Sequence, residues 1–155
     1  MVPDEFEAKH PVSAVASRIQ DTHQKIRTGI KALSDLEKLG DIRSVAEELF
    51  ELLTEHFNDE ERPDGLFDEL QSLRPTIDSQ LEFLRGEHRE IKQALQDLLT
   101  QIREAEAVHQ PGELEQREDH IRVSTDAFVQ LAYHHERIES RLVSETYYTD
   151  EGGAG

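Results

Sequence analysis

Four segments of the chain place apolar residues at alternating steps of three and four, the spacing of an α-helix with one buried face. Each segment carries a single histidine on its apolar stripe, and in chain order these are His23, His56, His88 and His135. Prolines or glycines fall between the segments, where helices end. The pattern predicts an all-α fold, an up-down-up-down antiparallel four-helix bundle with one histidine from each helix on the buried seam.

Local signals predict where the helices begin and end. The four expected helices span residues 11–39, 42–60, 76–107 and 113–146. Pro11 suits a first helical turn, Gly40 is expected to close the first helix, and Asp41 is expected to cap the second. The stretch between Pro63 and Pro75 is expected to form a partly helical end cap.

The length of the chain predicts a single domain. A chain of 155 residues suffices for one hydrophobic core but not for two independent ones. We expect residues 10–146 to form the bundle, with residues 1–9 and 147–155 as terminal extensions.

Charge and the lack of cysteine restrict the function classes. Thirty-four acidic residues against 17 basic ones give a formal net charge of −17, which repels nucleic acid and anionic membranes, so we expect neither as a partner. Without cysteine, any metal would be held by nitrogen and oxygen. No apolar run approaches the ~20 residues needed to cross a bilayer. No secretory signal pattern opens the sequence, so we expect a cytoplasmic location.

The second half of the sequence repeats the first. The first and third segments match at His23, Ile26, Ile30 and Leu33 against His88, Ile91, Leu95 and Leu98. The second and fourth match at Ile42, Leu49, Leu52, His56 and Glu60 against Ile121, Phe128, Leu131, His135 and Glu139. The chain is therefore interpreted as two helical hairpins, each with a lone histidine and a His-x-x-x-Glu pair.

The positions of the histidines along the helices predict that they meet. His23 lies 16 residues before the end of its expected helix, and His56 lies 14 residues after the start of the next. At 1.5 Å per residue, both stand about 20–25 Å from the turn between them. His88 and His135 differ in height by only about 5 Å on the same count. All four imidazoles are therefore expected in one layer of the core.

Two carboxylates share that layer. Glu60 and Glu139 each follow a histidine by four residues and so share its helix face. Two buried carboxylates without cations are very costly, and no lysine or arginine occupies the stripes, so a metal is expected to supply the charge. Six ligands around one ion remain an alternative, but the repeat favours two ions bridged by both carboxylates. Open coordination positions favour iron, with manganese second, over a four-coordinate zinc site.

Two short sequences resemble the hemerythrin-like (HHE cation-binding) family. They are His56-Phe-Asn-Asp-Glu60-Glu61, followed by Gly65-Leu66-Phe67, and Gly86-Glu87-His88-Arg89-Glu90-Ile91. The resemblance extends from about His10 to Val143. It implies an up-down-up-down bundle with two non-haem iron ions, oxo- or hydroxo-bridged. His23 and His56 would share one iron, His88 and His135 the other, with Glu60 and Glu139 as bridges.

Two positions depart from the family's oxygen carriers. The carriers have a second histidine four residues after the first in the third helix, where this chain has Lys92. They also place an aspartate five residues after the histidine of the fourth helix, where this chain has Ser140, with Glu139 one residue earlier. The set of four histidines and two glutamates resembles a variant branch, in which redox or peroxide chemistry is favoured over reversible O2 transport.

Several residues have competing interpretations. Glu61 could bridge in place of Glu60, although the symmetry with Glu139 favours Glu60. A ferritin-like site would need Glu-x-x-His pairs on two helices, and the chain has one, Glu106 with His109. His134 is expected to be an interhelical or surface residue, not a ligand. The remaining histidines are expected to face solvent: His10, His109 and His120. The spacing selects none of the three tyrosines as a ligand: Tyr133, Tyr147 and Tyr148.

Three hypotheses for function follow. The first is a di-iron protein that binds or reacts with O2 or peroxide, as a sensor, a handler of iron or oxygen, or a weak catalase- or peroxidase-like enzyme. The second is a non-catalytic metal buffer or iron sensor. The third is an interaction bundle without metal. The sequence leaves open whether the chain is an enzyme.

Overall fold

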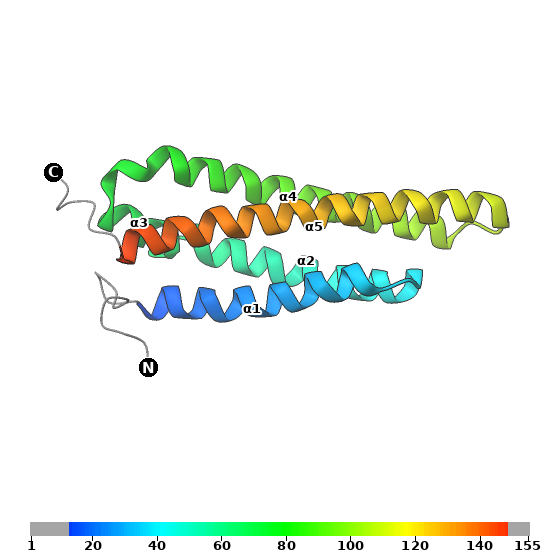
Figure 1. Cartoon of the computed structure of the whole chain (residues 1–155), viewed down its shortest axis with the longest axis horizontal. Coiled ribbons are helices and arrows are strands. Elements are labelled where there is room, and N and C mark those ends of the chain that lie inside the picture. Colours follow the sequence, from blue (N-terminus) through cyan, green and yellow to red (C-terminus); the bar gives the residue numbers. More distant parts are fainter. Residues whose placement is uncertain (1–12, 149–155) are drawn as a thin grey trace.

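The structure, a computed structural model, describes residues 13–148, and these form an all-α four-helix bundle. The bundle helices are α1 (Ala14–Asp35), α2 (Leu39–Glu61), α4 (Asp78–Glu106) and α5 (Pro111–Tyr148). A short helix, α3 (Leu66–Leu73), and a 3-10 turn, η2 (Pro75–Ile77), connect α2 to α4 at one end, and α4 and α5 run on past the α1–α2 turn at the other (Figure 1). The predicted fold class is confirmed.

The connection between α1 and α2 differs from the sequence prediction. The first helix ends at Asp35, before Gly40, because Leu36 takes an extended backbone with φ −84° and ψ 146°. Leu39 already begins α2, so Gly40 lies inside the first turn of that helix. Asp41 is not the cap but lies in the same turn, where its charge suits the positive end of the helix dipole.

A tight turn follows α2. Asp64 has a left-handed backbone with φ 62°, and its N–H donates to Asp68 Oδ2 at 2.9 Å. A Cβ atom at Gly65 would lie 2.4 Å from the carbonyl oxygen of Asp59, so only glycine fits here. The chain then enters α3, which confirms the expected end cap.

Buried apolar residues form two clusters along the bundle axis. One lies toward the α1–α2 and α4–α5 turns and includes Ile30, Leu49 and Leu95. The other lies under α3 and includes Leu70, Leu84 and Tyr147. Along α1 and α4 the core histidines fall between residues of the two clusters. The histidine layer therefore separates the two halves of the core.

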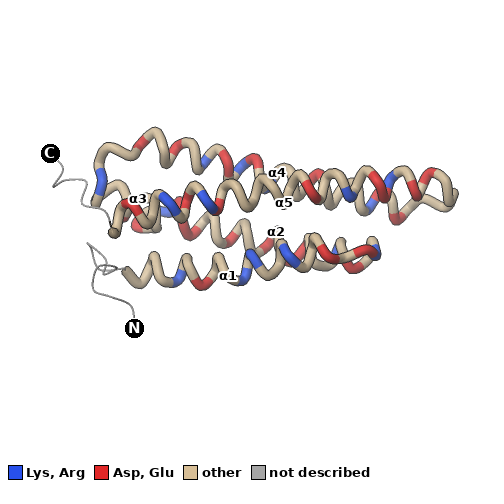
Figure 2. The backbone as a smooth tube through the Cα atoms, viewed as in Figure 1, with Lys and Arg blue, Asp and Glu red and all other residues tan. Residues whose placement is uncertain are grey.

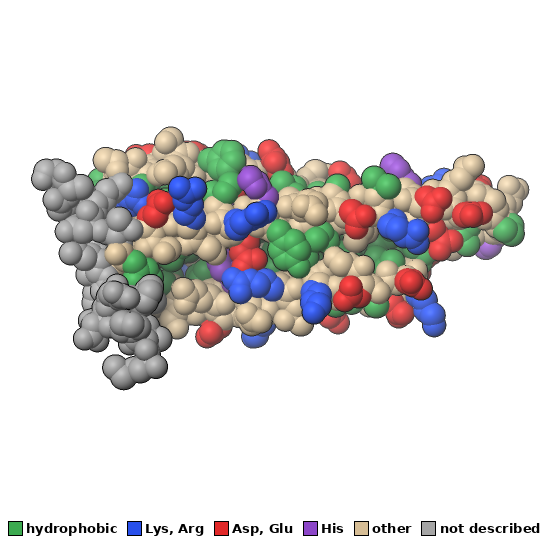
Figure 3. All heavy atoms as spheres, in the orientation of Figure 1, with side chains coloured by type: hydrophobic (Ala, Val, Ile, Leu, Met, Phe, Trp, Pro, Cys, Tyr) green, Lys and Arg blue, Asp and Glu red, His purple; other side chains and the backbone are tan. Residues whose placement is uncertain are grey.

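Charged residues follow all four long helices (Figure 2). Lysine and arginine side chains are interspersed with acidic ones on the face seen in Figure 3, with small apolar patches between them. No helix within residues 13–148 is long and apolar enough to cross a membrane.

Candidate metal centre

The four histidines of the apolar stripes lie inside the bundle. Their exposed fractions are 9% for His23, 2% for His56, 1% for His88 and 5% for His135. Each comes from a different long helix, where it takes the place of an apolar residue in the 3-4 spacing. The helical register that buries the leucines and isoleucines therefore also buries the imidazoles.

The structure brings these histidines together with both predicted glutamates. Two groups of donor atoms, each within a span of 4.8 Å, share Glu60 and Glu139. One group adds His23 and His56, here named the N-terminal pair, and the other adds His88 and His135, here named the C-terminal pair. This is the pairing that the family resemblance implied.

The Nε2 atoms of all four imidazoles point toward the two carboxylates. Oε1 of Glu60 lies 3.0 Å from Nε2 of His56 and 3.3 Å from Nε2 of His88. The two oxygens of Glu139 lie 2.9 Å from Nε2 of His23 and 3.0 Å from Nε2 of His135. Each carboxylate therefore faces one histidine from each pair.

Although these atoms lie close together, none of the contacts has the geometry of a hydrogen bond. Both oxygens of Glu60 and both of Glu139 lack a hydrogen-bond partner among the described residues, as do Nε2 of His88 and His135. Both glutamates have an exposed fraction of 0%. Buried polar atoms are rarely left unpaired, and donor atoms that converge without bonding one another fit a shared cation. The residues present therefore fit a metal centre of nitrogen and oxygen ligands.

The two buried carboxyls, Glu60 and Glu139, shift each other's pKa in opposite directions. Burial and the facing Glu139 raise the pKa of Glu60 well above its usual value. Burial also opposes the charge on Glu139, but the Glu60 carboxyl and the imidazoles of His135, His23 and His88 hold its pKa well below the usual value. Burial therefore favours the neutral form of Glu60, and the neighbours of Glu139 favour its charged form.

The imidazoles respond differently to burial. Burial lowers the pKa of His56 to about 3, against the attraction of Glu139. The pKa of His135 is raised, because Glu139 and Glu87 outweigh the effect of its burial. A neutral His56 has a free lone pair at any ordinary pH, which is the form that binds metal.

Two further carboxylates contact the C-terminal pair from behind. Nδ1 of His88 donates to Oε2 of Glu61 at 2.8 Å, and Nδ1 of His135 donates to Oε1 of Glu87 at 2.9 Å. We name Glu61 and Glu87 the outer carboxylates. The sequence suggested Glu61 only as an alternative bridging ligand, and it suggested no role for Glu87. The available signal was adjacency, because each directly follows or precedes a residue of the central cluster.

Aromatic rings enclose the same pair. Phe57 stacks on His88 with ring centroids 3.8 Å apart and planes 10° apart, and Phe67 stacks on it with its centroid at 5.5 Å. Phe57 is 3% exposed and Phe67 is fully buried. The stacked rings fix the plane of the His88 imidazole and separate it from water.

The alternative candidate residues lie elsewhere. The Lys92 ammonium lies 6.0 Å from the centroid of the Phe50 ring, on the flank of α2. Tyr147 is buried, but its hydroxyl donates to Glu69, and Tyr133 and Tyr148 are exposed. His109 and His120 are exposed as expected, and His134 is a surface residue, while His10 lies outside the described residues.

Small cavities adjoin the N-terminal pair. A cavity of about 20 Å³, the size of one water molecule, is lined by three histidines, by Glu136 and by apolar side chains; the histidines are His23, His56 and His135. A groove of about 240 Å³ between α1 and α5 reaches His23 from outside. Ser140 lies in this groove. The histidine layer can therefore be approached by a small molecule from the α1–α5 side.

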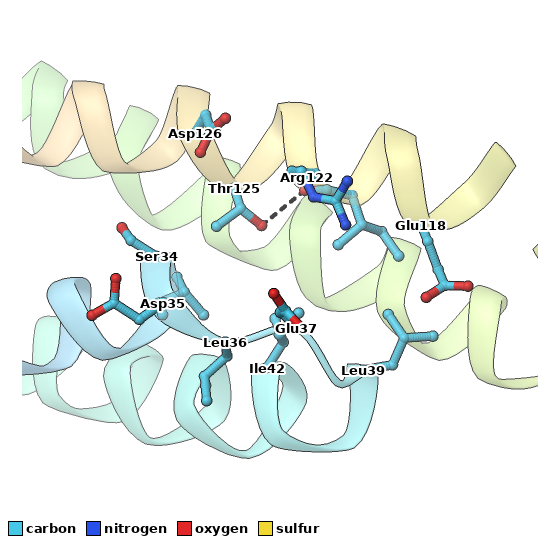
Figure 4. Close-up of a pocket in the computed structure, with 12 residues that line it drawn as sticks. Ser34, Asp35, Leu36, Glu37, Leu39, Ile42, Glu118, Arg122, Thr125 and Asp126 are labelled. Atoms are coloured by element: carbon cyan, nitrogen blue, oxygen red, sulfur yellow. Dashed lines mark hydrogen bonds between the residues drawn. The ribbon is translucent and has the colours of Figure 1, made fainter. Parts of the chain in front are cut away.

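A larger cavity, of about 370 Å³, lies between the α1–α2 turn and α5 (Figure 4). None of its lining residues belongs to the two donor groups. Its buried hydroxyl, on Thr125, already donates to the carbonyl oxygen of Ile121 at 2.8 Å. The unpaired buried atoms that indicate a cation lie in the histidine layer and not here.

The fold and this layer together define a four-helix bundle with a buried cation site of histidine and carboxylate ligands. A family model described as the hemerythrin HHE cation-binding domain matches residues 14–146. The chain therefore belongs to the hemerythrin HHE family, whose members bind metal cations, typically iron. No curated protein and no solved structure matches the chain.

Proposed function

We propose that the chain holds two iron ions and binds or reacts with O2 or peroxide. The proposed ligands are the six residues of the two donor groups: His23, His56, Glu60, His88, His135 and Glu139. The observation that carries the proposal is the set of four buried carboxylate oxygens without hydrogen bonds, facing imidazole nitrogens from four helices. Manganese fits the same donor atoms and is the second choice.

The glutamates and the histidines would have different roles as ligands. Glu60 and Glu139 face both histidine pairs, so each would bridge the two ions. His23 and His56 would complete one ion, and the C-terminal pair the other. Bound iron would supply reversible electron transfer and coordination positions left open by so few protein ligands. The cavity of about 20 Å³ beside His56 would leave room for a ligand about the size of a water molecule.

Lys92 favours reaction over reversible oxygen transport. A lysine directed toward Phe50 does not replace the second histidine of the oxygen carriers. Within residues 13–148, the donor group of the C-terminal pair contains two histidines and no third. Fewer protein ligands leave more positions for exogenous ligands, which supports redox sensing, handling of iron or oxygen, or weak peroxide decomposition.

Metal analysis with optical spectroscopy tests this proposal. Purified protein loaded with Fe2+ without oxygen should contain two irons per chain, and its near-ultraviolet spectrum should change when O2 or peroxide is added. The variants His56→Ala and His135→Ala should each lose iron. A wild-type sample that takes up iron but shows no spectral response to either oxidant contradicts the reactive function.

The metal-buffering or iron-sensing alternative has its own supporting observation. The unpaired carboxylates sit between the two halves of the core, so an ion bound there would support the folding of both. This function predicts reversible iron uptake and a bundle that loosens after chelation, with no turnover of peroxide. Hydrogen exchange of α1 and α5 amides, with and without iron, measures the loosening directly.

The remaining expectations from the sequence are part of the same proposal. A surface of net charge −17 is not expected to bind nucleic acid or anionic vesicles. A filter-binding assay and a vesicle sedimentation assay check these two points. A cytoplasmic location remains a prediction, which cell fractionation would check.

A further inference from the structure

The internal repeat breaks at the outer carboxylates. Ser140 follows Glu139 as Glu61 follows Glu60 in the first hairpin. In the same way, Thr22 precedes His23 as Glu87 precedes His88. The six central residues obey the twofold pattern of the hairpins, whereas the residues behind them do not. The C-terminal pair has two outer carboxylates, and the N-terminal pair has a serine and a threonine in the matching places.

Among the described residues, neither Thr22 nor Ser140 makes a hydrogen bond with an imidazole. The Thr22 hydroxyl donates to the carbonyl oxygen of Arg18, one turn back in its own helix, at 3.0 Å. Ser140 is exposed in the groove beside His23. Nδ1 of His56 is buried and has no hydrogen-bond partner within residues 13–148. The two pairs therefore differ in how firmly their rings are held.

The difference matters for metal affinity. A histidine that donates its second N–H to a carboxylate is fixed in one tautomer and ring orientation, and it becomes a better electron donor to a metal. Loss of such a partner typically costs about 10–100-fold in metal affinity. The outer carboxylates also add negative charge behind one pair, which attracts a cation to that side.

Glu87 should contribute more than Glu61. Glu87 is 5% exposed, and no lysine or arginine nitrogen lies within 4 Å of its oxygens among the described residues. Glu61 is partly exposed, and Arg85 lies 3.9 Å from its Oε1, which offsets part of its charge. The stronger effect is therefore expected behind His135.

We propose that the two halves of the centre are unequal. The C-terminal pair, supported by Glu61 and Glu87, binds its ion first and holds it; the N-terminal pair binds the second, exchangeable ion. Glu61 and Glu87 are positioning residues, because each acts on the metal through an imidazole. The inference rests on the proposed two-ion centre and deepens it by giving the order of loading.

Anaerobic titration calorimetry with Fe2+ alone tests the order. Wild-type protein should bind two ions in two steps, with dissociation constants at least about 10-fold apart. Glu87→Gln should weaken the first step by about 10–100-fold and so bring the two steps together. Glu61→Gln, at a partly exposed position that tolerates substitution, should do the same to a smaller extent.

Glu136→Gln is the matched control. Glu136 directly follows His135 and lines the same small cavity, but its carboxylate pairs with Arg27 across the α1–α5 seam and makes no hydrogen bond or ion pair with an imidazole among the described residues. Its loss removes the same charge at a similar place without releasing a ring. This variant should keep two separated steps.

The repeat also suggests a gain-of-function variant. Ser140→Glu places a carboxylate in the position that matches Glu61, facing the groove that reaches His23. It should tighten the second step and leave the first unchanged. This variant adds a group at an exposed site, so a failure to fold does not obscure the result.

Proton NMR of the Co2+-loaded protein provides a readout that a merely structural role would not move. The imidazole N–H protons of His88 and His135 should give slowly exchanging, strongly shifted signals, because each is held by a carboxylate. Glu61→Ala should abolish the first of these and Glu87→Ala the second. The N–H proton of His23, which lies beside the groove and has no carboxylate partner, should exchange faster than these two.

Three results would overturn the inference. The first is two equal affinities in the wild type, which leaves the two-ion function standing. The second is that Glu87→Gln and Glu136→Gln weaken the two binding steps to the same extent. Only the net charge near the centre would then matter. The third is a wild-type chain that binds no iron, and this alone also refutes the proposed function.

Discussion

Replacing Glu60 with glutamine separates the cost of the buried carboxyl pair from its value to a metal. In the metal-free chain, burial and the nearby Glu139 raise the pKa of Glu60, which favours the neutral form of this carboxyl. Glutamine has nearly the same shape and is also neutral. The free energy of unfolding of the metal-free variant should therefore stay within about 1 kcal/mol of the wild type.

The same substitution should remove most of the stabilisation by metal. An ion present at 1,000 times its dissociation constant adds about 4 kcal/mol to stability. In a chain of this size, 1 kcal/mol shifts the melting temperature by about 2–4 °C, so one ion should raise it by roughly 8–16 °C. Glu60 faces a histidine from each pair, and its loss should weaken both sites.

Glu139→Gln is the contrasting variant. Its neighbours hold the pKa of Glu139 well below its usual value, which favours the charged form of this carboxyl, in contact with His23 and His135. Its amide would leave buried imidazoles without their anion, at a cost of about 1–3 kcal/mol in the metal-free state. The melting temperature without metal should fall by roughly 2–12 °C.

Circular dichroism melts of the wild type and both variants, with chelator and with excess Fe2+ under nitrogen, give all six melting temperatures. Equal losses for Glu60→Gln and Glu139→Gln without metal would refute the opposite pKa shifts of the two carboxyls. A full metal-induced shift in both variants would refute their role as ligands.

Three further predictions concern residues around the centre. Burial lowers the pKa of His56 to about 3, so between about pH 6.5 and pH 3 the unfolded metal-free chain binds the extra proton. As the pH falls through that window, the free energy of unfolding of the chain should fall by up to about 1.4 kcal/mol per pH unit. Acid titration followed by circular dichroism should show that His56→Leu is less acid-sensitive than the wild type. Tyr147→Phe removes the hydroxyl that donates to Glu69, so denaturant unfolding should show a loss of about 1 kcal/mol while the iron spectrum stays unchanged; a changed spectrum would reveal a tyrosine ligand. Gly65→Ala places a Cβ atom 2.4 Å from the Asp59 carbonyl oxygen and should lower the melting temperature, whereas Gly40→Ala, where nothing lies within 4 Å, should not.

The sequence predicts the histidine layer well because helical periodicity is rigid. A 3-4 spacing fixes which residues share a face, and two short inter-helix turns fix their heights. Only the helical spacing and the shortness of the turns were needed to place these residues in one layer, and the conformation of the turns was not. The same spacing was less accurate for the apolar stripe, where Leu53 and Ala132 are buried while their neighbours Leu52 and Leu131 are only half-buried. A buried helix face is wider than a single 3-4 row, so neighbouring positions compete for the core.

Helix ends and side-chain partners between helices were harder to predict. Gly40 carries a strong stop signal, but the extended backbone at Leu36 had already ended α1, and a glycine is tolerated in the first turn of the next helix. The partnership of Glu87 with His135 joins residues 48 positions apart, and it depends on the rotation of α4 relative to α5. Spacing along one helix carries no information about that rotation.

The place of the centre along the bundle connects its chemistry to folding. The histidine layer lies between two apolar clusters, and its four carboxylate oxygens have no hydrogen-bond partners among the described residues. An unpaired polar layer weakens the packing between the two halves, and a bound cation would reverse that effect. If the C-terminal pair loads first, the first ion joins α2, α4 and α5 through His88, His135 and the shared glutamates. The second ion would then fix α1 through His23, so α1 would be the part of the bundle whose stability reports whether the exchangeable ion is bound.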